Sequence, residues 1–352
     1  MGGPGAEHEV SLMSGREVAR ALRDGGRYEV IELVLEDRRA TADEITAAYE
    51  SVRRGHREPS EARLSLPCRS DPPDESGGSY ESECEPGGLY GALKLGAERP
   101  VVFPVLHGQW GEGGPLQDIL ETLGLPYVAS DPRAAAVAMD KAATKEIVRA
   151  EGVLTPPDCL LDPGAPCPLD PPLVLKPIDD GSSVDLRICH TPQEVVAARA
   201  VLHQRRGSLM AERFVLGREV TAGIVCGEPL PLIEIIPAPD AGFYDYQAKY
   251  FRDDTRYVLE PDLPAGTAQA CTEAALIAFN LLGCRDIARA DFIVNDLGAW
   301  FLEINTMPGF TTHSLLPMAA ARRGQDMPTL CGRLVEAALA RSGVPVVAAH
   351  HG

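Results

Sequence analysis

The chain has 352 residues, of which 45% are hydrophobic, and a formal net charge of −18. This length suits two or three compact domains, and the acidic balance argues against a nucleic acid or an anionic membrane as partner. No apolar run approaches the roughly 18–20 residues that a membrane helix needs, and no signal-peptide pattern opens the chain. Nine scattered cysteines without metal-type spacing favour reduced thiols, so we expect a cytoplasmic protein.

The first hundred residues begin with a glycine-rich segment and end in the least informative part of the chain. Residues 1–5 form a loop, and a helix is predicted from Glu7 to about Leu22. Glu7 could simply be a favourable charge at a helix N-terminus. Residues 28–36 read as a buried strand, whereas residues 71–88, rich in Pro, Gly, Ser and acidic side chains, indicate a flexible insertion within the uninformative stretch 37–98.

A second glycine-rich loop follows a predicted strand at residues 101–106. The loop, residues 107–114, reads HGQWGEGG, and Pro115 suits the first turn of a helix that Gly124 ends. A strand, a glycine-rich loop and a helix in this order place ligands at the carboxyl end of a parallel sheet. His107 is a candidate ligand-binding residue here, although a structural loop histidine would fit the pattern as well.

The next candidate site is a loop that follows a lysine. A helix is predicted to begin at residues 139–141. Further along, the predicted strand 173–176 ends in Lys176, and the loop 177–183 comes directly after it. Backbone N–H groups, the hydroxyls of Ser182 and Ser183 and one fixed cation would cradle phosphate, although the Walker pattern is absent. A capping box at residues 191–194 then starts a helix to about residue 206.

Two acids and an aromatic stretch follow this helix. Glu212 lies in a predicted strand, residues 209–215, and Glu219 comes shortly after it. Both would pass as ordinary surface acids. The polar and aromatic residues 243–250 are typical of an active-site lid, and helices are predicted over residues 267–282 and 327–341.

The most informative stretch is residues 289–314. Its runs 290–294 and 299–305 are rich in strand formers, and residues 296–298 suit a three-residue hairpin loop that ends in glycine. This register places Asp291 opposite Glu303, and Arg289 opposite Asn305. Because side chains alternate along a strand, these four should share a face with Ile293 and Phe301. The core should receive the other set: Ala290, Phe292, Val294, Trp300, Leu302 and Ile304.

Two carboxylates, an amide oxygen and a guanidinium on one sheet face form a site for a hard cation. Mg²⁺ prefers one or two carboxylates together with substrate phosphates, and a bridging carboxylate can clamp two such ions on a nucleoside triphosphate. Gly309 follows with an N–H that can face a ligand, and a hydroxyl-rich loop ends at Ser314. Taken alone, the hairpin could also be a solvated surface element with an ion pair.

The string E-x-N-T-x-P-G-x-T-x-x-S, residues 303–314, resembles the D-alanine–D-alanine ligase family of the ATP-grasp superfamily. Four other segments agree in the family's order: residues 2–14, 107–127, 176–184 and 244–250. The resemblance implies an α/β ATP-grasp fold in three parts. These are an N-terminal parallel α/β domain (1–138) without its first strand, a central β-rich lid (139–217) and a C-terminal catalytic α+β domain (218–352), with ATP between the last two.

The resemblance also implies a role for each matching residue. Glu7 would hold the ammonium of the first D-alanine, His107 and Ser314 would bind substrate, and Arg289 with the Gly309 N–H would stabilise the oxyanion. In the lid, Tyr250 would be tied to Ser182. ATP would be bound by Lys141, Lys176, Ser183, Glu212, Glu219 and Lys249. Two Mg²⁺ or Mn²⁺ ions would be held by Asp291, Glu303 and Asn305.

The implied reaction joins two D-alanines through an acyl phosphate, for peptidoglycan synthesis, with only small-molecule partners and a homodimer left open. Three alternatives remain: an ATP-grasp ligase for another amino acid, a D-alanine–D-lactate ligase, and a non-catalytic nucleotide-binding relative. The chain departs from the family at three places. Gly113 replaces an acid, and Asp185 replaces a glycine and would loosen the phosphate loop. Met1 stands where a short apolar strand is expected, so we expect that translation of the native protein starts upstream of Met1.

Overall fold

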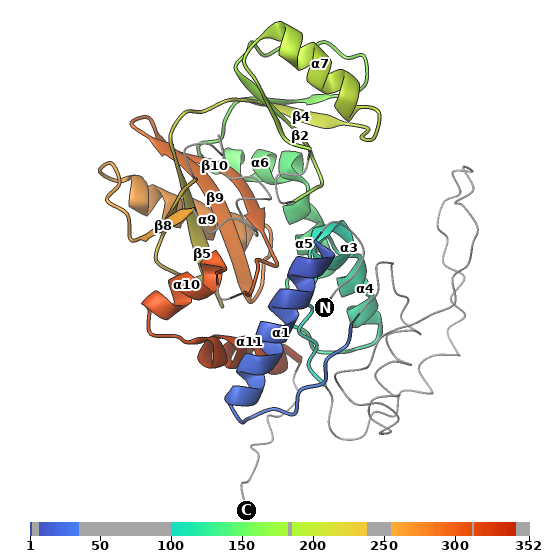
Figure 1. The fold of residues 1–352 in the computed structure, drawn as a ribbon, viewed down its shortest axis with the longest axis vertical. Coiled ribbons are helices and arrows are strands. Elements are labelled where there is room, and N and C mark those ends of the chain that lie inside the picture. The colour runs from blue at the N-terminus through green and yellow to red at the C-terminus, as the bar shows by residue number, and fades with distance from the viewer. Residues whose placement is uncertain (2–6, 35–99, 182–184, 238–254, 312, 343–352) are drawn as a thin grey trace, which may run out of the picture.

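In the computed structural model, the described residues are 1, 7–34, 100–181, 185–237, 255–311 and 313–342. The predicted insertion at 71–88 and the predicted lid stretch at 243–250 lie outside them. Two sheets and their covering helices are stacked along the long axis of the molecule (Figure 1). Within the described ranges, no helix is long and apolar enough to cross a membrane.

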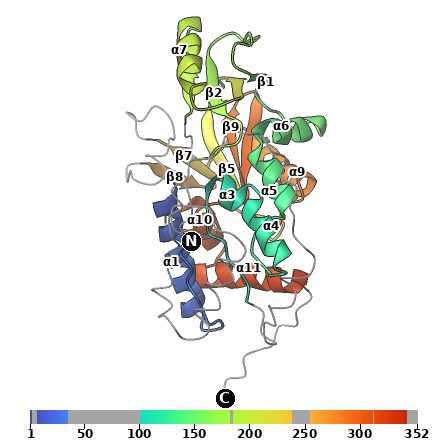
Figure 2. The ribbon, with the colours of Figure 1, turned by 90° about the vertical axis from the view of Figure 1, so that its right-hand side faces the viewer.

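The N-terminal part is a group of helices around extended chain. Its helices are α1 (His8–Asp24), α3 (Gly108–Glu112), α4 (Pro115–Thr122) and α5 (Pro132–Met139). Helices α1, α3 and α4 share an apolar core with α11 (Met327–Ser342), which crosses beneath them in Figure 2, whereas Ala138 of α5 belongs to a core of the larger sheet. The expected helices at 7–22 and 115–124 are therefore present, close to their predicted bounds.

The strands expected at 28–36 and 101–106 are not formed in the described residues. The second is reduced to an isolated parallel bridge between Val102 and Tyr127. Within it, Val128 N–H donates to the Val102 carbonyl over 2.9 Å. Pro104 has no N–H for a ladder, and the Leu106 N–H turns back to the Pro104 carbonyl at 2.7 Å. The second half of this run is buried and the first half is partly buried, but the run is too irregular to pair as a strand, so the predicted strand is wrong.

The smaller sheet is antiparallel and lies at the top of Figure 1. Its strand order is β1-β4-β2-β3, and its bounds are β1 (Asp158–Leu161), β2 (Leu173–Pro177), β3 (Arg187–Cys189) and β4 (Leu209–Arg213). Helix α7 (Pro192–Leu202) covers one face through a small apolar cluster. Thr191 caps this helix as predicted, because its hydroxyl accepts the Glu194 N–H at 3.2 Å.

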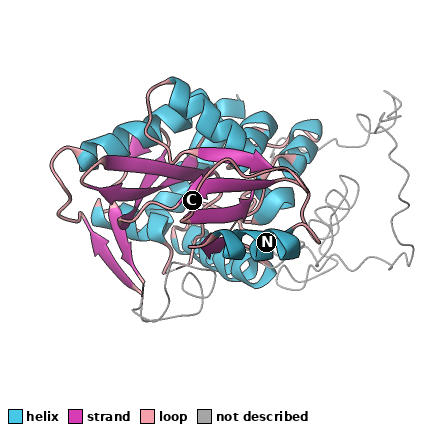
Figure 3. Ribbon diagram, turned by 90° about the horizontal axis from the view of Figure 1, so that it is seen from above, coloured by secondary structure: helices cyan, strands magenta, loops and turns pink. Residues whose placement is uncertain are grey.

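The larger sheet is also antiparallel, in the order β10-β9-β5-β7-β8, with β6 paired to β5. Its strands are β5 (Arg218–Val225), β6 (Glu228–Pro229), β7 (Ile233–Ile236), β8 (Arg256–Leu259), β9 (Ile287–Asn295) and β10 (Gly298–Asn305). Helices α6 (Lys141–Ala150) and α9 (Thr267–Leu281) pack on the face that carries Val220, Ala222 and Ile224. Helix α10 (Leu315–Arg322) packs on the opposite face against Gly223, so helices lie on both sides of the sheet (Figure 3).

The β9–β10 hairpin has the predicted pairs but not the predicted path. Its loop has two residues rather than three, since Gly298 already pairs with Asn295, and the register shifts by one residue between Phe301 and Glu303. Between the shorter loop and this β-bulge, the side chains lie on the faces opposite to those predicted. Phe301 is buried in the core, Leu302 lines the cleft described below, and Trp300 pairs with Ile293 of the cleft face, so the predicted faces of these three residues are wrong.

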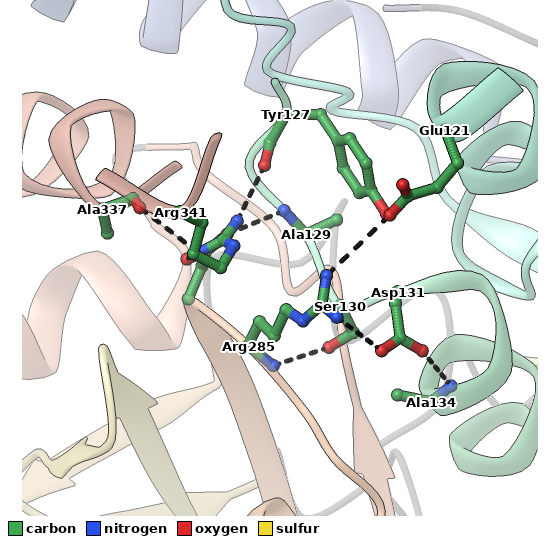
Figure 4. A network of polar contacts seen from close by, with 10 residues as sticks. Glu121, Tyr127, Ala129, Ser130, Asp131, Ala134, Arg285, Ala337 and Arg341 are labelled. Atoms are coloured by element: carbon green, nitrogen blue, oxygen red, sulfur yellow. Dashed lines mark hydrogen bonds and ion pairs between the residues drawn. The ribbon is translucent and has the colours of Figure 1, made fainter. Parts of the chain in front are cut away.

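A polar junction around the buried Asp286 holds the N-terminal part against the larger sheet (Figure 4). Arg341 of α11 donates to the Asp286 carboxylate, which also accepts the Ala129 N–H at 3.0 Å. Beside it, Arg285 donates to Asp131 at 2.8 Å. Asp286 precedes β9, so the junction fixes the start of the strand that carries the hairpin acids.

Candidate active site

An open cleft lies between the two sheets, with about 930 Å³ of space not filled by protein atoms. Apolar side chains from both sheets line it, among them Val174 of β2 and Ile293 of β9. Six of the predicted site residues line the same cleft: Lys141, Lys176, Glu212, Glu219, Asp291 and Glu303.

The hairpin acids lie side by side on this face. Glu303 pairs with Asp291, and Asn305 with Arg289, as predicted. The Asp291 carboxylate is fixed by the Arg289 guanidinium at 2.8 and 2.9 Å and by the Thr221 hydroxyl at 2.7 Å. Arg289 is thus held by Asp291 in this structure, and part of its charge is already matched.

Lys141 links the smaller sheet to the hairpin. It is the first residue of α6, whose N-terminus is capped by Asp140 through the N–H groups of residues 142 and 143. Its ammonium donates to the Asp180 carbonyl at 2.5 Å and lies 3.3 Å from the Glu303 carboxylate. One cation therefore contacts both the loop after β2 and an acid predicted to bind metal.

Glu212 is locked between two lysines. Its carboxylate accepts a hydrogen bond from Lys176 at 2.8 Å and another from Lys145. Burial alone would raise the pKa of Glu212, but the two ammonium groups outweigh it and lower the pKa. Lys145, which is fully buried, was missed by the sequence analysis. Its position one helical turn after Lys141 was the available signal, because residues four apart share a helix face.

A second group of ionisable side chains surrounds the glycine-rich loop after residue 106. His107 Nδ1 lies 3.1 Å from the Met307 carbonyl, while its buried Nε2 has no hydrogen-bond partner among the described residues. Burial lowers the pKa of His107, so the ring is neutral, with Nδ1–H donating to the carbonyl and Nε2 left as an acceptor. The Nε2 atom of this histidine can therefore accept a hydrogen bond from a ligand.

Glu112 is the other residue that the sequence analysis overlooked in this loop. Its carboxyl accepts the Gly108 N–H at 2.9 Å and is buried. Burial, and then the nearby Glu7 carboxylate, raise the pKa of Glu112 to about 8. Carbons placed at the β position of Gly181 would lie 3.9 Å from both Glu112 Oε1 and Glu7 Oε2. The two carboxyl groups therefore converge on the start of the predicted phosphate loop.

The loop after β10 is compact around Ser314. The Ser314 hydroxyl oxygen accepts the Thr311 N–H at 2.9 Å, and a β-carbon added to Gly309 would lie only 2.8 Å from that oxygen. Glycine at 309 is thus required by a close approach. The Asn305 side-chain oxygen accepts the Met307 N–H at 3.1 Å, which fixes the amide at the end of the hairpin.

Several expectations concern residues beside or outside the described part. Ser182, Ser183, Lys249 and Tyr250 lie outside it. The Asp185 charge, which we expected to loosen the phosphate loop, is instead matched by Arg205 and Arg206. Gly113 ends α3, where a β-carbon would lie 2.4 Å from the Gln109 carbonyl oxygen, so this backbone excludes an acidic side chain.

The oxygen donors at the hairpin suit Mg²⁺ when combined with ligand phosphates. In the part of the chain that the structure describes, no group of three or more His, Cys, Asp or Glu side chains is arranged to hold a metal. Asp291 and Glu303 supply two carboxylates, and Asn305 supplies an amide oxygen. Mg²⁺ is usually held by one or two carboxylates plus substrate phosphates rather than by a complete protein cage, so the donor set fits.

Comparison with known proteins gives the family. Models of the D-ala D-ala ligase N-terminus and C-terminus match residues 1–130 and 167–336. A D-alanine–D-alanine ligase of Syntrophotalea carbinolica is 34% identical over 344 residues, which cover 97% of this chain and 95% of that protein. The chain belongs to the D-alanine–D-alanine ligase family. A relative from Aquifex aeolicus is likewise 34% identical, over 95% of this chain and 98% of its own length.

A solved structure agrees with this family membership. The D-alanine–D-alanine ligase of Bacillus anthracis complexed with ATP has a TM-score of 0.71 and covers 97% of this chain and 96% of its own. At 24% identity, this likeness concerns the fold. The predicted family, its α/β ATP-grasp fold and the expectation of a ligase are thereby confirmed. The individual roles of the site residues stay predictions.

Proposed function

We propose that the protein joins two D-alanines to D-alanyl-D-alanine at the expense of ATP. One observation carries the proposal beyond the family name: Lys141 contacts both the loop after β2 and Glu303 in a single cleft. An enzyme that transfers a phosphoryl group needs cations that bring the nucleotide and the metal-binding acids together. In a chain with a net charge of −18, such a local concentration of lysines marks the place for a polyanion.

The nucleotide would occupy the cleft between the smaller and larger sheets, the second and third parts of the proposed division. Lys141 and Lys176, with Ser183 and Lys249, would face its phosphates, and Glu212 and Glu219 its adenosine end. Asp291, Glu303 and Asn305 would hold two Mg²⁺ or Mn²⁺ ions. When bound, these ions would offset the charge of the phosphates.

The amino acids would lie next to the loops of His107 and Gly309. Glu7 would hold the ammonium of the first D-alanine, near the acceptor nitrogen of His107, and Ser314 would hold the carboxylate of the second. Arg289 and the Gly309 N–H would stabilise the oxyanion, while Ser182 and Tyr250 would order the lid.

Two bond changes complete the reaction. A carboxylate oxygen of the first D-alanine attacks the γ-phosphorus, and the bond from phosphorus to ADP breaks. The amine nitrogen of the second D-alanine then attacks the acyl carbon, loses its proton, and expels phosphate. Charge-complementary groups fixed before the reaction lower both barriers, because they need no reorganisation when charge develops. The product and the reduced cysteines both suit a cytoplasmic enzyme of peptidoglycan synthesis.

The test is phosphate release from ATP with and without D-alanine, in the presence of Mg²⁺. Release that depends on D-alanine supports the ligase, whereas nucleotide binding without release would favour a binding protein. D-alanine and D-lactate then compete as second substrate at neutral pH, and the products are weighed. We expect D-alanyl-D-alanine to dominate, and a predominance of D-alanyl-D-lactate would contradict the proposed specificity.

A further inference from the structure

Arg206 lies just beyond the end of α7 and joins two carboxylates of the loop that follows β2. Its Nη2 donates to Asp180 at 2.5 Å, and its Nε donates to Asp185 at 3.1 Å. These acids stand on either side of residues 182–184, which lie outside the described part. A guanidinium has a fixed fork of donors, so one side chain can set the distance between two carboxylates.

Asp185 depends on this arrangement for both its charge and its backbone. Its φ is +59°, in the left-handed region that favours glycine. One carboxylate oxygen accepts from Arg205 at 3.2 Å and the other from Arg206. The two arginines therefore balance the charges of Asp180 and Asp185, and they hold a strained residue in place.

Asp180 connects Arg206 to the residues that contact the hairpin. Its carboxylate accepts the Gly181 N–H at 2.9 Å through the oxygen that Arg206 does not use. Its carbonyl accepts the Lys141 ammonium, which in turn contacts Glu303. A continuous set of contacts thus runs from the end of α7 to the acids of the larger sheet.

We propose that Arg206 is a positioning residue for the nucleotide. It holds Asp180 so that Lys141 and the Gly181 N–H keep their positions, and it cancels carboxylate charge that would otherwise repel the phosphates of ATP. It acts through Asp180 and Asp185 and contacts no reacting atom. The inference rests on the proposed function to the extent that the nucleotide occupies the cleft.

The first experiment compares R206A with a matched control, R205A, by steady-state kinetics. Arg205 is an adjacent arginine that pairs with the same Asp185 but does not contact Asp180. We expect R206A to raise the KM for ATP about tenfold, the size of one lost charge-assisted contact, with the KM for D-alanine unchanged. The KM of R205A for ATP should stay within about twofold of the original value, because an exposed ion pair contributes little.

The second experiment asks whether Arg206 acts through the charge of Asp185. The double variant D185G/R206A removes the carboxylate and supplies a residue that adopts positive φ without strain. Its KM for ATP should return to within about threefold of the original, because neighbouring residues that act together are not additive. R206K keeps the positive charge but lacks the forked guanidinium, so its KM for ATP should lie between those of R206A and the original protein. If R206A does not fold, R206K replaces it in the comparison with R205A.

Three results would overturn the inference. These are a KM for ATP in R206A within twofold of the original, a double variant no better than R206A, or equal rises in both KM values. If the original chain releases no phosphate in response to D-alanine, the proposed function fails instead. The inference about Arg206 is then tested by calorimetric titration of the same proteins with MgATP, and R206A must bind MgATP more weakly than R205A.

Discussion

Two buried glutamates in the site region have opposite acidities. Glu212, at the end proposed for the nucleotide, and Glu112, at the end proposed for the amino acids, are 3% and 5% exposed. The pKa of Glu212 is lowered, whereas that of Glu112 is raised to about 8. Since their burial is nearly equal, the difference comes from neighbours. Glu212 lies between two ammonium groups, and Glu112 lies near the Glu7 carboxylate.

The comparison separates two uses of buried charge. The group of Glu212, Lys145 and Lys176 is matched within the protein, so it can keep its arrangement before any ligand arrives. Near Glu112, the acceptor nitrogen of His107 has no protein partner among the described residues, and the buried acid is held neutral. We infer that the first group is a fixed scaffold, while the second is completed by a charged substrate.

The largest expected effect comes from E212A, which tests whether the pairing holds Glu212 charged. The substitution leaves two buried ammonium groups facing each other, and breaking one partner of a buried pair costs about 3–5 kcal/mol. The free energy of unfolding, measured in urea, should fall by this amount. A matched control is E336A, which breaks an exposed ion pair with Arg27 and should cost far less, because water screens such pairs. Equal losses in the two variants would contradict the scaffold interpretation.

The next effect concerns Glu303, which is joined to the nucleotide end through Lys141. E303Q keeps the shape of the side chain and removes its charge. We expect turnover to fall by about a hundredfold or more, the loss seen when one electrostatic stabiliser is removed, with folding nearly intact. Mg²⁺-dependent phosphate release and circular dichroism measure the two quantities. Near-normal turnover in a folded E303Q protein would remove Glu303 from the metal site.

The last prediction distinguishes Glu112 by the pH dependence of its contribution to stability, which changes gradually from one pH unit to the next. Between its ordinary pKa of 4.5 and the folded value of about 8, the unfolded chain loses the Glu112 proton while the folded protein keeps it. Rising pH therefore favours the unfolded state, by at most about 1.4 kcal/mol per pH unit. The glutamine of E112Q does not titrate.

Urea unfolding of the original protein and of E112Q at several values between pH 5 and pH 8 makes this measurable. The original should lose stability relative to E112Q as the pH rises, and His107 contributes equally to both, so its titration cancels from the difference. A difference that stays constant over this range would show that Glu112 is already ionised in the folded protein.

The hairpin shows how far sequence reasoning reached. The pairs of Asp291 with Glu303 and of Arg289 with Asn305 were predicted correctly from a three-residue loop and a regular ladder. The structure has a two-residue loop and a one-residue bulge. The two differences cancel beyond the bulge, because each changes the register by one residue, so the polar pairs are right. Before the bulge, Trp300, Phe301 and Leu302 lie on the faces opposite to those predicted.

The amino-acid pattern by itself determined the family, the helix starts marked by Thr191 and Asp140, and the acids of the hairpin, because capping and strand alternation depend on residues close together in the chain. Tertiary structure decided the rest. The Phe301 N–H beside the bulge donates to the Leu154 carbonyl, far away in sequence, at 2.8 Å. Whether Glu112 or Glu212 is charged likewise depends on side chains brought in from distant elements, since a pKa is set by the groups that surround a carboxyl in space.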